Sequence, residues 1–127
     1  MIDDDSGFLS TLYHALRTHR RRRVIRLVQD AGSTVLSVQT LAREIAAAEH
    51  GVAYQHATGE PYRNVYNALS QTHLPTLADA RVIVYDSDRQ TVSAGPDLPL
   101  AAFLLAMNRS AIETLIEVES IDRDDPP

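Results

Sequence analysis

The chain has 127 residues, a formal net charge of −5 at pH 7 and no cysteine. The length predicts one domain with a sizeable core, and the lack of cysteine excludes disulfide frameworks, thiolate metal sites and cysteine nucleophiles. The stretch MIDDDSGF is acidic and lacks the apolar region of a secretion signal. The longest apolar run, 98–107, is shorter than the about 20 residues that a bilayer span needs. We therefore expect a cytoplasmic protein.

The charges are unevenly distributed along the chain. Six of the 17 acidic residues lie in the segments 1–5 and 122–127, which we expect to be acidic tails, so the remainder is close to neutral. An acidic total does not forbid nucleic-acid binding, but it supplies no attractive field over the whole molecule. All 12 basic residues are arginine. This composition is typical of a GC-rich genome and of adaptation to high salt, which together indicate a halophilic archaeon.

Two helices are predicted at the start of the chain. Apolar residues at helical spacing predict the first over 6–18 and the second up to a stop at Gly32. The second helix opens with four arginines, Arg20–Arg23, although the positive end of the helix dipole disfavours cations there. One interpretation is a patch that contacts a protein partner, or DNA phosphates through Arg21 and Arg22. The other is a solvated face whose arginines pair with acids elsewhere in the chain.

A short strand and a third helix follow. Residues 34–36 predict the strand, and Ser37 is a good N-cap for a helix that ends near Gly51. This helix corresponds to the positioning helix of a helix-turn-helix. The connection from Gly51 to Glu60 is longer than the turn of about three or four residues typical of that motif. It is therefore either a loop with an insertion or a continuation of the helix.

The predicted recognition helix spans about 61–74, with Pro61 suited to its first turn. Its apolar residues share one face: Tyr62, Val65, Tyr66 and Leu69. The opposite face has no acid and carries the residue types that hydrogen-bond phosphates and base edges, which we expect to contact DNA: Arg63, Asn64, Asn67, Ser70 and Gln71. Pro75 lacks a backbone donor and predicts a kink or stop near His73, followed by a short segment over 75–80.

A β-hairpin is predicted next. Its strands are Val82–Tyr85 and Thr91–Ala94, and its polar turn contains one cation, Arg89, which we expect to approach a phosphate or the minor groove. A helix followed at once by a β-ribbon is the layout of a winged helix-turn-helix, in which the helix enters the major groove and the ribbon flanks it. The sequence therefore predicts a mainly α fold with a small β wing (α+β), a winged helix-turn-helix domain over 6–95.

Three segments, RRRVIRLV, TLAREIA and NVYNALSQTHLPTLADARVIVYD, resemble the haloarchaeal winged helix-turn-helix domain family, which is similar to the arsenic-repressor-type transcriptional regulators. The resemblance covers about residues 8–95, and its most specific part is Gln71–Pro75 with Val82–Asp86. It implies a winged helix, transcriptional regulation and a haloarchaeal cytoplasm, and it carries over no catalytic residue. The metal sites of arsenic-repressor-type proteins need cysteines, which this chain lacks.

After Pro96 a further helix is predicted over 97–121. Apolar residues cover more of its surface than one core contact needs. We expect one face to pack on the domain and another to form a homodimer interface; the alternative is a helix that folds back on its own domain alone. The expected interface residues are Leu100, Phe103, Leu104, Met107, Ile112, Leu115 and Ile116.

The sequence offers no set of residues for chemistry. The five histidines lack ligand spacing, and no glycine-rich phosphate loop or nucleophile–base set is recognisable. We therefore expect no enzyme activity, cofactor or metal. The predicted function is that of a homodimeric, sequence-specific DNA-binding transcriptional regulator. The alternative is a winged-helix protein–protein interaction module without DNA binding, in which Arg20–Arg23 dock an acidic partner.

Overall fold

The computed structural model describes residues 2–107. Its helices are α1 (Ile2–Ala15), α2 (His19–Ala31), α3 (Val38–His50), α4 (Gly59–Ala68) and α5 (Leu74–Asp79), with a 3-10 turn η1 (Tyr54–His56) and a π-helical segment η2 (Leu69–His73). Its strands are β1 (Leu36–Ser37), β2 (Ile83–Asp86) and β3 (Thr91–Ala94). Residues 98–107 are also helical and are called the 98–107 helix below.

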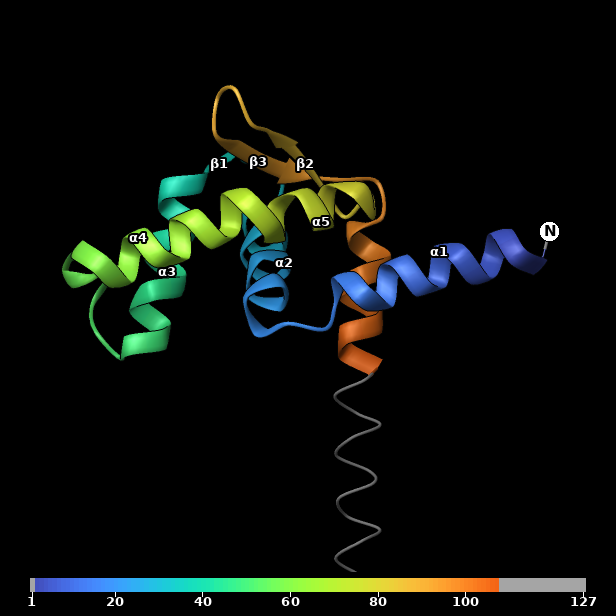
Figure 1. The fold of residues 1–127 in the computed structure, drawn as a ribbon, viewed down its shortest axis with the longest axis horizontal. Helices are drawn as coiled ribbons and strands as arrows, with labels where there is room; N and C mark the ends of the chain where they lie inside the picture. The colour runs from blue at the N-terminus through green and yellow to red at the C-terminus, as the bar shows by residue number, and fades with distance from the viewer. Residues whose placement is uncertain (1, 108–127) are drawn as a thin grey trace, which may run out of the picture.

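The strands of the described region form one antiparallel sheet in the order β1-β3-β2. Ile83 of β2 pairs with Ala94 of β3, and Leu36 of β1 pairs with Val92. The strand before α3 therefore joins the hairpin that follows α5, and the hairpin projects beyond the helices (Figure 1). Helices α2, α3 and α4 with this sheet make a winged-helix-like α+β fold, which confirms the predicted fold class.

The core is enclosed by α2, α3, the α4–α5 segment and the sheet. Complete burial of one aliphatic side chain stabilises a fold by about 1.5–3 kcal/mol, and every element of this core contributes such residues. Val65 and Leu69 are fully buried, so they fix which side of α4 faces inward. Other large side chains that are fully buried include Leu12, Val24, Ile25, Val28, Val38, Leu41, Ile45, Leu74, Leu77, Val82 and, in β3, Val92.

The cap residues act as predicted. The hydroxyl of Ser37 accepts a hydrogen bond from the Thr40 N–H at 3.0 Å and begins α3. Gly32 and Gly51 end α2 and α3 with φ of 62° and 64°, a region that glycine enters without the steric penalty of a Cβ. The local signals for α2 and α3 were therefore sufficient to place both helices.

The sequence predicts either a kink or a stop near His73, and the helix that begins with α4 does not stop there. It passes through η2, in which the Leu74 N–H donates to the Leu69 carbonyl in the five-residue spacing of a π-helix. Pro75 then lies in the first turn of α5, where its missing N–H is tolerated. The proline thus produces a π segment at the predicted position and leaves the helix continuous through Asp79.

Other boundaries differ from the prediction by a few residues. Helix α4 begins at Gly59, so Glu60 lies in its first turn. Helix α1 begins at Ile2, so residues 2–5 are part of a helix and not a separate tail. The connection between α3 and α4 contains η1, so it is a loop with a 3-10 turn and not a continuation of α3.

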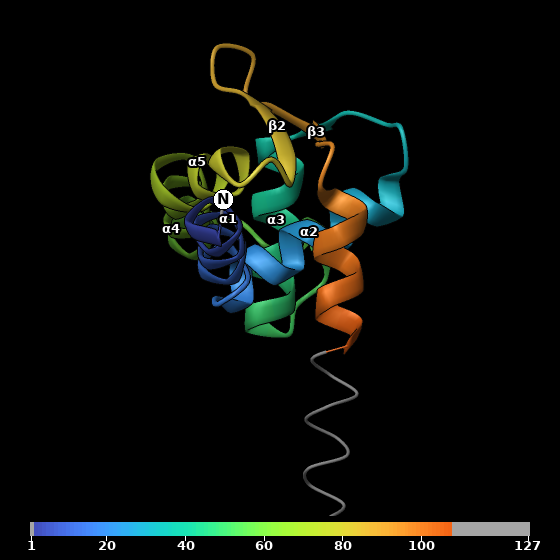
Figure 2. The same ribbon diagram turned by 90° about the vertical axis from the view of Figure 1, so that its right-hand side faces the viewer.

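The 98–107 helix packs on the domain through Leu98 and Ala101, which are buried. Figure 2 shows this helix and α4 on different sides of the molecule. Of the predicted features, the interface residues Ile112, Leu115 and Ile116 and the tail 122–127 lie outside the described residues. Over residues 2–107, no helix combines the length and the apolar character needed to cross a membrane.

Candidate functional site

Four of the five recognition-helix residues predicted to contact DNA lie on an exposed face of α4 and η2: Arg63, Asn64, Asn67 and Gln71. Because Val65 and Leu69 hold the other side of the helix on the core, these four side chains point to solvent. None of them makes a side-chain hydrogen bond or ion pair within residues 2–107. Glu60, in the first turn, is exposed as well and adds a carboxylate that the predicted helix did not include.

Ser70, the fifth predicted contact, is half-buried and faces the hairpin. Its hydroxyl donates to Oε1 of Gln90 at 3.3 Å. Ser70 therefore joins α4 and η2 to the wing, and its predicted contact with DNA stays a prediction.

Gln90 is the centre of the contact between the wing and the helices. Its Oε1 accepts from the Tyr66 hydroxyl at 2.7 Å, and its Nε2 donates to the Tyr85 hydroxyl at 3.0 Å and to the Ser87 carbonyl at 2.8 Å. Its own carbonyl accepts from the Val38 N–H at 3.0 Å. Gln90 has φ of 55°, a left-handed conformation that costs a residue with a Cβ roughly 1–2 kcal/mol. These bonds fix the wing relative to α4 and to the first turn of α3.

The tip of the wing is ordered by Asp86. One carboxylate oxygen of Asp86 accepts from the N–H groups of Asp88 and Arg89, each at 3.1 Å. The Arg89 side chain is 83% exposed, and its Nε lies 3.9 Å from the other oxygen of Asp86. Exposed ion pairs of this kind contribute about 0–1 kcal/mol. Arg89 is therefore at the tip, as predicted, with its charge partly balanced by Asp86.

Arg21 does not lie on the surface. It is 4% exposed, and its guanidinium donates to the carbonyls of Ala15 and His14, both at 2.9 Å. The last carbonyls of a helix have no partner within the helix, so Arg21 satisfies the end of α1. A buried guanidinium has no access to a phosphate, and the predicted DNA contact of Arg21 is therefore wrong.

The neighbouring arginines also make contacts within the chain. Arg22 is half-buried and donates to the carbonyls of Leu16 and Arg17 at 3.0 and 3.1 Å, which weakens its predicted role at DNA. Arg20 binds both carboxylate oxygens of Glu49, at 2.8 and 2.9 Å, and this hydrogen bonding lowers the pKa of Glu49. The run of arginines thus joins α1, α2 and α3, and this accounts for cations at the amino terminus of α2.

Arg21 also reaches the recognition helix. Its Nη1 lies 3.3 Å from Nδ1 of His73 in η2. Burial, and then the positive charge of Arg21, lower the pKa of His73. A neutral ring has a lone pair on one nitrogen, which suits a contact with a guanidinium donor.

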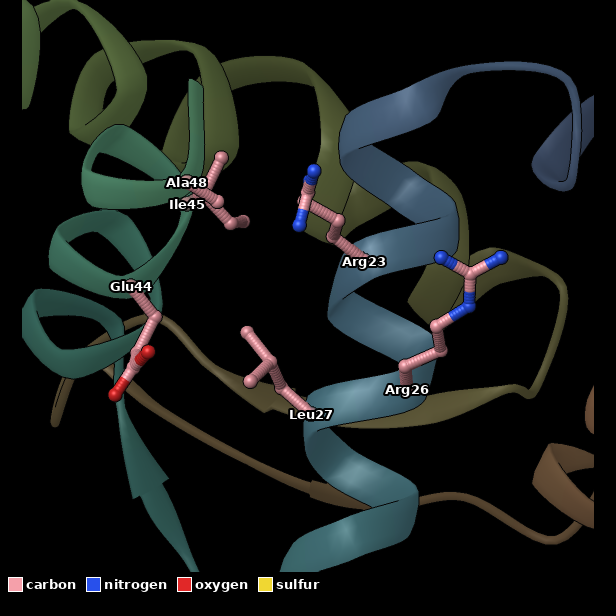
Figure 3. Close-up of a pocket in the computed structure, with 6 residues that line it drawn as sticks. All are labelled: Arg23, Arg26, Leu27, Glu44, Ile45 and Ala48. Atoms are coloured by element: carbon pink, nitrogen blue, oxygen red, sulfur yellow. The ribbon is translucent and has the colours of Figure 1, made fainter. Parts of the chain in front are cut away.

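A small groove lies between α2 and α3 (Figure 3). It has a volume of about 130 Å³ and is lined by Arg23, Arg26, Leu27, Glu44, Ile45 and Ala48. Arg23 and Leu27 point toward α3, whereas the guanidinium of Arg26 points away from it (Figure 3). The groove is too small for a drug-sized ligand, since such sites occupy about 300–1,000 Å³.

Two histidines come together at the end of α3. His50 and His56 line one pocket of about 140 Å³. Within the part of the chain that the structure describes, no three histidine, aspartate or glutamate residues are grouped so that they could hold a metal ion. A tetrahedral site would need further ligands.

The 98–107 helix has an apolar face that nothing covers within the described residues. Phe103, Met107 and Leu100 are 61%, 51% and 37% exposed, and they recur at helical spacing. Leu104 is partly buried against the core, so its own domain already covers part of its side chain, and its place in a dimer interface stays a prediction. The exposed face on this helix is therefore narrower than predicted.

Comparison with protein families identifies one match. The model described as Domain of unknown function (DUF7344) covers residues 13–93. The chain belongs to the DUF7344 family. The DUF7344 domain runs from the last three residues of α1 into β3 and leaves the 98–107 helix outside. Neither the curated proteins nor the solved structures gave a match. The resemblance to haloarchaeal winged-helix and arsenic-repressor-type proteins is not tested by these comparisons and stays a prediction.

Sequence reasoning missed Gln90 and Tyr66 as residues that position the site. A glutamine just before the returning strand of a hairpin gives little signal, because the contact with Tyr66 spans 24 positions. Helical periodicity places Tyr66 on the apolar face, yet its hydroxyl donates a hydrogen bond to Gln90. A partly buried tyrosine usually finds a hydrogen-bond partner, and this was the available clue.

Proposed function

We propose that this DUF7344 protein is a sequence-specific DNA-binding transcriptional regulator that acts as a homodimer. The recognition helix, made of α4 and η2, lies in the major groove, and the β2–β3 wing flanks it. The protein acts without catalysis, and no cofactor or metal is needed.

The observation that carries the proposal is the exposed face of α4 and η2. Asparagine and glutamine pair with adenine through two hydrogen bonds, and arginine pairs with guanine or a phosphate. Asn64, Asn67, Gln71 and Arg63 supply these groups, and their polar atoms have no partner within residues 2–107. The wing supports the same reading because Gln90 holds it against this helix.

The exposed face of α4 and η2 has little net charge, so binding to DNA has to depend on short-range contacts. Arg63 contributes one cation, while Glu60 lies in the first turn of the same helix. At molar salt the Debye length is about 3 Å, so long-range attraction contributes little. Affinity then comes from close hydrogen bonds, shape and the avidity of a dimer. We expect a shallow dependence on salt, since few phosphates are neutralised.

The exposed apolar face of the 98–107 helix supports dimerisation. Leu100, Phe103 and Met107 would be removed from water by the same face of a second copy. Figure 2 shows this helix away from α4, so a dimer formed through it leaves the recognition helix free. A two-fold dimer presents two recognition helices to a palindromic site.

The alternative, a protein–protein module that docks an acidic partner on Arg20–Arg23, has less support. Arg20 is paired with Glu49, Arg21 is bonded to the last carbonyls of α1, and Arg22 is bonded to the turn that follows α1. Three of the four arginines are thus engaged within the chain. No other observation favours an acidic partner at that surface.

The test is selection of genomic DNA fragments by the full chain at high potassium chloride. We expect the parent to enrich a defined site and an Arg63→Ala, Asn67→Ala double variant to lose that selectivity. The matched control is Arg26→Ala, Gln29→Ala, which removes one arginine and one amide from exposed positions of α2. Selective binding that survives equally in both variants, or a parent that selects no fragment, would contradict the proposal.

A further inference from the structure

A second pocket lies beside the start of α4. It has a volume of about 340 Å³ and is formed by the first turns of α3, by η1 and its following loop, and by α4. Its polar residues are Gln39, Thr40, Arg43, Tyr54, Thr58 and Tyr62. The site described above uses none of them.

Each of these six side chains can donate a hydrogen bond, and none is an acid. The hydroxyl of Ser37 donates to Oγ1 of Thr40 at 2.9 Å, so the hydrogen of Thr40 is left for another acceptor. Thr58 occupies the N-cap position of α4, but its side chain makes no capping hydrogen bond. The Tyr62 phenol is protonated at neutral pH and can donate, and burial raises its pKa further above the ordinary value.

Arg43 supplies the charge of the pocket. Its guanidinium carbon lies 5.0 Å from the centroid of the Tyr54 ring, within the range of a cation–π contact that holds the side chain in place. Arg43 is half-buried and has no ion pair within residues 2–107. Glu44, the next residue, lines the groove on the α2 side of α3 and not this pocket. A partly desolvated cation surrounded by neutral donors is matched by an anion with several acceptor oxygens.

We propose that this pocket binds a phosphate-type oxyanion, with Arg43 as the charged ligand and the hydroxyls and amide around it as donors. The source of the oxyanion is a backbone phosphate of bound DNA. Tyr62 of the pocket directly precedes Arg63 of the exposed face in α4, so the pocket borders the surface that is proposed to contact the duplex. This choice of source rests on the proposed function, whereas the oxyanion site itself does not.

The site is tested on the full chain without DNA. Backbone amide chemical shifts are followed by NMR during titration with inorganic phosphate at constant ionic strength, with chloride as the reference anion. We expect saturable shifts at 39–43, 54–58 and 62 in the parent and in Arg26→Gln, and their loss in Arg43→Gln. Arg43→Gln keeps a side chain of polar donors, and its thermal unfolding is measured to show that it folds. Shifts that do not saturate in the parent, or that are unchanged in Arg43→Gln, would overturn the site.

The source is tested by fluorescence anisotropy with duplex DNA over a range of moderate salt concentrations. We expect Arg43→Gln to weaken binding by roughly three- to tenfold for all sequences alike, and to reduce the magnitude of the salt slope by about one unit. Arg43→Lys keeps the charge and should keep the slope. The Arg26→Gln control should resemble the parent.

The two arms separate the two proposals. Saturable phosphate binding with DNA affinity unchanged in Arg43→Gln would overturn DNA as the source and leave a site for a free anion. A parent that binds no DNA would overturn the proposed function, and the phosphate titration would still decide the oxyanion site.

Discussion

Gln90 makes hydrogen bonds to Tyr66, Ser70, Tyr85 and Ser87 through its side chain and to Val38 through its carbonyl. One polar residue at the end of the wing turn therefore connects the wing to α3, α4 and η2. Arg21 does the same for α1, α2 and η2 from a buried position. Specific polar contacts, more than net charge, hold the proposed binding surface in its geometry.

Replacing Gln90 tests this connection. We expect Gln90→Ala to lower the free energy of unfolding by about 2 kcal/mol, since each hydrogen bond contributes about 0.5–1.5 kcal/mol net and water replaces some of them. Gln90→Gly loses the same side-chain bonds but relieves the left-handed backbone, so it should be more stable than Gln90→Ala by about 1 kcal/mol. Urea unfolding measures both differences. An alanine variant as stable as the parent would show that the bonds contribute nothing.

His73 predicts a pH dependence of stability. Its pKa is lowered in the fold, first by burial and then by the charges of Arg21 and Arg20, which outweigh the opposite effect of Glu49. The unfolded chain therefore binds a proton more readily, and the stabilisation is complete above the ordinary histidine pKa of about 6.5. It is lost as the pH falls from there toward the lowered pKa. Urea unfolding at several pH values should show this loss in the parent and a smaller one in His73→Gln; identical profiles would refute it.

Contacts between single residues far apart in the chain were the feature that the sequence indicated least. Arg21 and His73 are 52 positions apart, and Ser70 and Gln90 are 20 apart. No local sequence pattern indicates such pairs. The sequence therefore predicts that both Arg21 and Ser70 are free to contact DNA. The exposed residues Arg63, Asn64, Asn67 and Gln71 were predicted correctly as solvent-facing, because their position depends only on helical periodicity.

At the scale of elements, caps and periodicity predicted α2, α3, α4 and the hairpin closely. The strand Thr91–Ala94 has the predicted bounds, and β2 is shifted by one residue. The π segment was not predicted, because a proline in a helical pattern indicates a disturbance without saying how the backbone accommodates it. The short strand β1 begins two residues later and ends one residue later than predicted, since its pairing with β3 depends on the tertiary fold.

Among the glycines, Gly95 is the one at which an added Cβ would meet backbone atoms of the described residues. It follows β3 and is buried, and a Cβ built there would lie 2.6 Å from the Arg81 carbonyl oxygen and 2.7 Å from the Ile83 nitrogen. Because these are backbone atoms, they cannot rotate away. We expect Gly95→Ala to destabilise the fold by about 1–3 kcal/mol or more.

The control for Gly95 is Gly7→Ala in α1, where the added Cβ has nothing within 4 Å. This change should be neutral or stabilise by up to about 1 kcal/mol, since alanine favours a helix over glycine. Thermal and urea unfolding of the two variants give the comparison. Equal stability of Gly95→Ala and the parent would mean that the wing and the following turn pack less closely than described.

For the whole molecule, two surfaces on different sides have separate proposed roles, as Figure 2 shows for α4 and the 98–107 helix. The apolar composition after Pro96 predicted that a helix there would have two contacts, and the structure describes one of them, through Leu98 and Ala101. Removal of the chain after Pro96 would also remove these two core residues. A substitution on the exposed face is therefore the cleaner test of dimerisation.

We expect Phe103→Glu to convert a dimer into a monomer, because the 61% exposed ring is free to change without loss of core packing. A carboxylate at the centre of an apolar interface is buried without a partner and opposes association. Light scattering measures the mass, and Gln29→Glu on the exposed side of α2 is the charge-matched control. A parent that is monomeric, or a Phe103→Glu variant that stays dimeric, would remove the 98–107 helix from the interface.

The central claim is that the exposed face of α4 and η2 binds duplex DNA. It is tested most directly by amide chemical-shift perturbation on adding the duplex that genomic selection enriches. The account predicts the largest shifts at Arg63, Asn64, Asn67 and Gln71, with further shifts at the wing tip around Arg89. Shifts confined to other surfaces, such as the α2–α3 groove around Arg26 or the 98–107 helix, would contradict it.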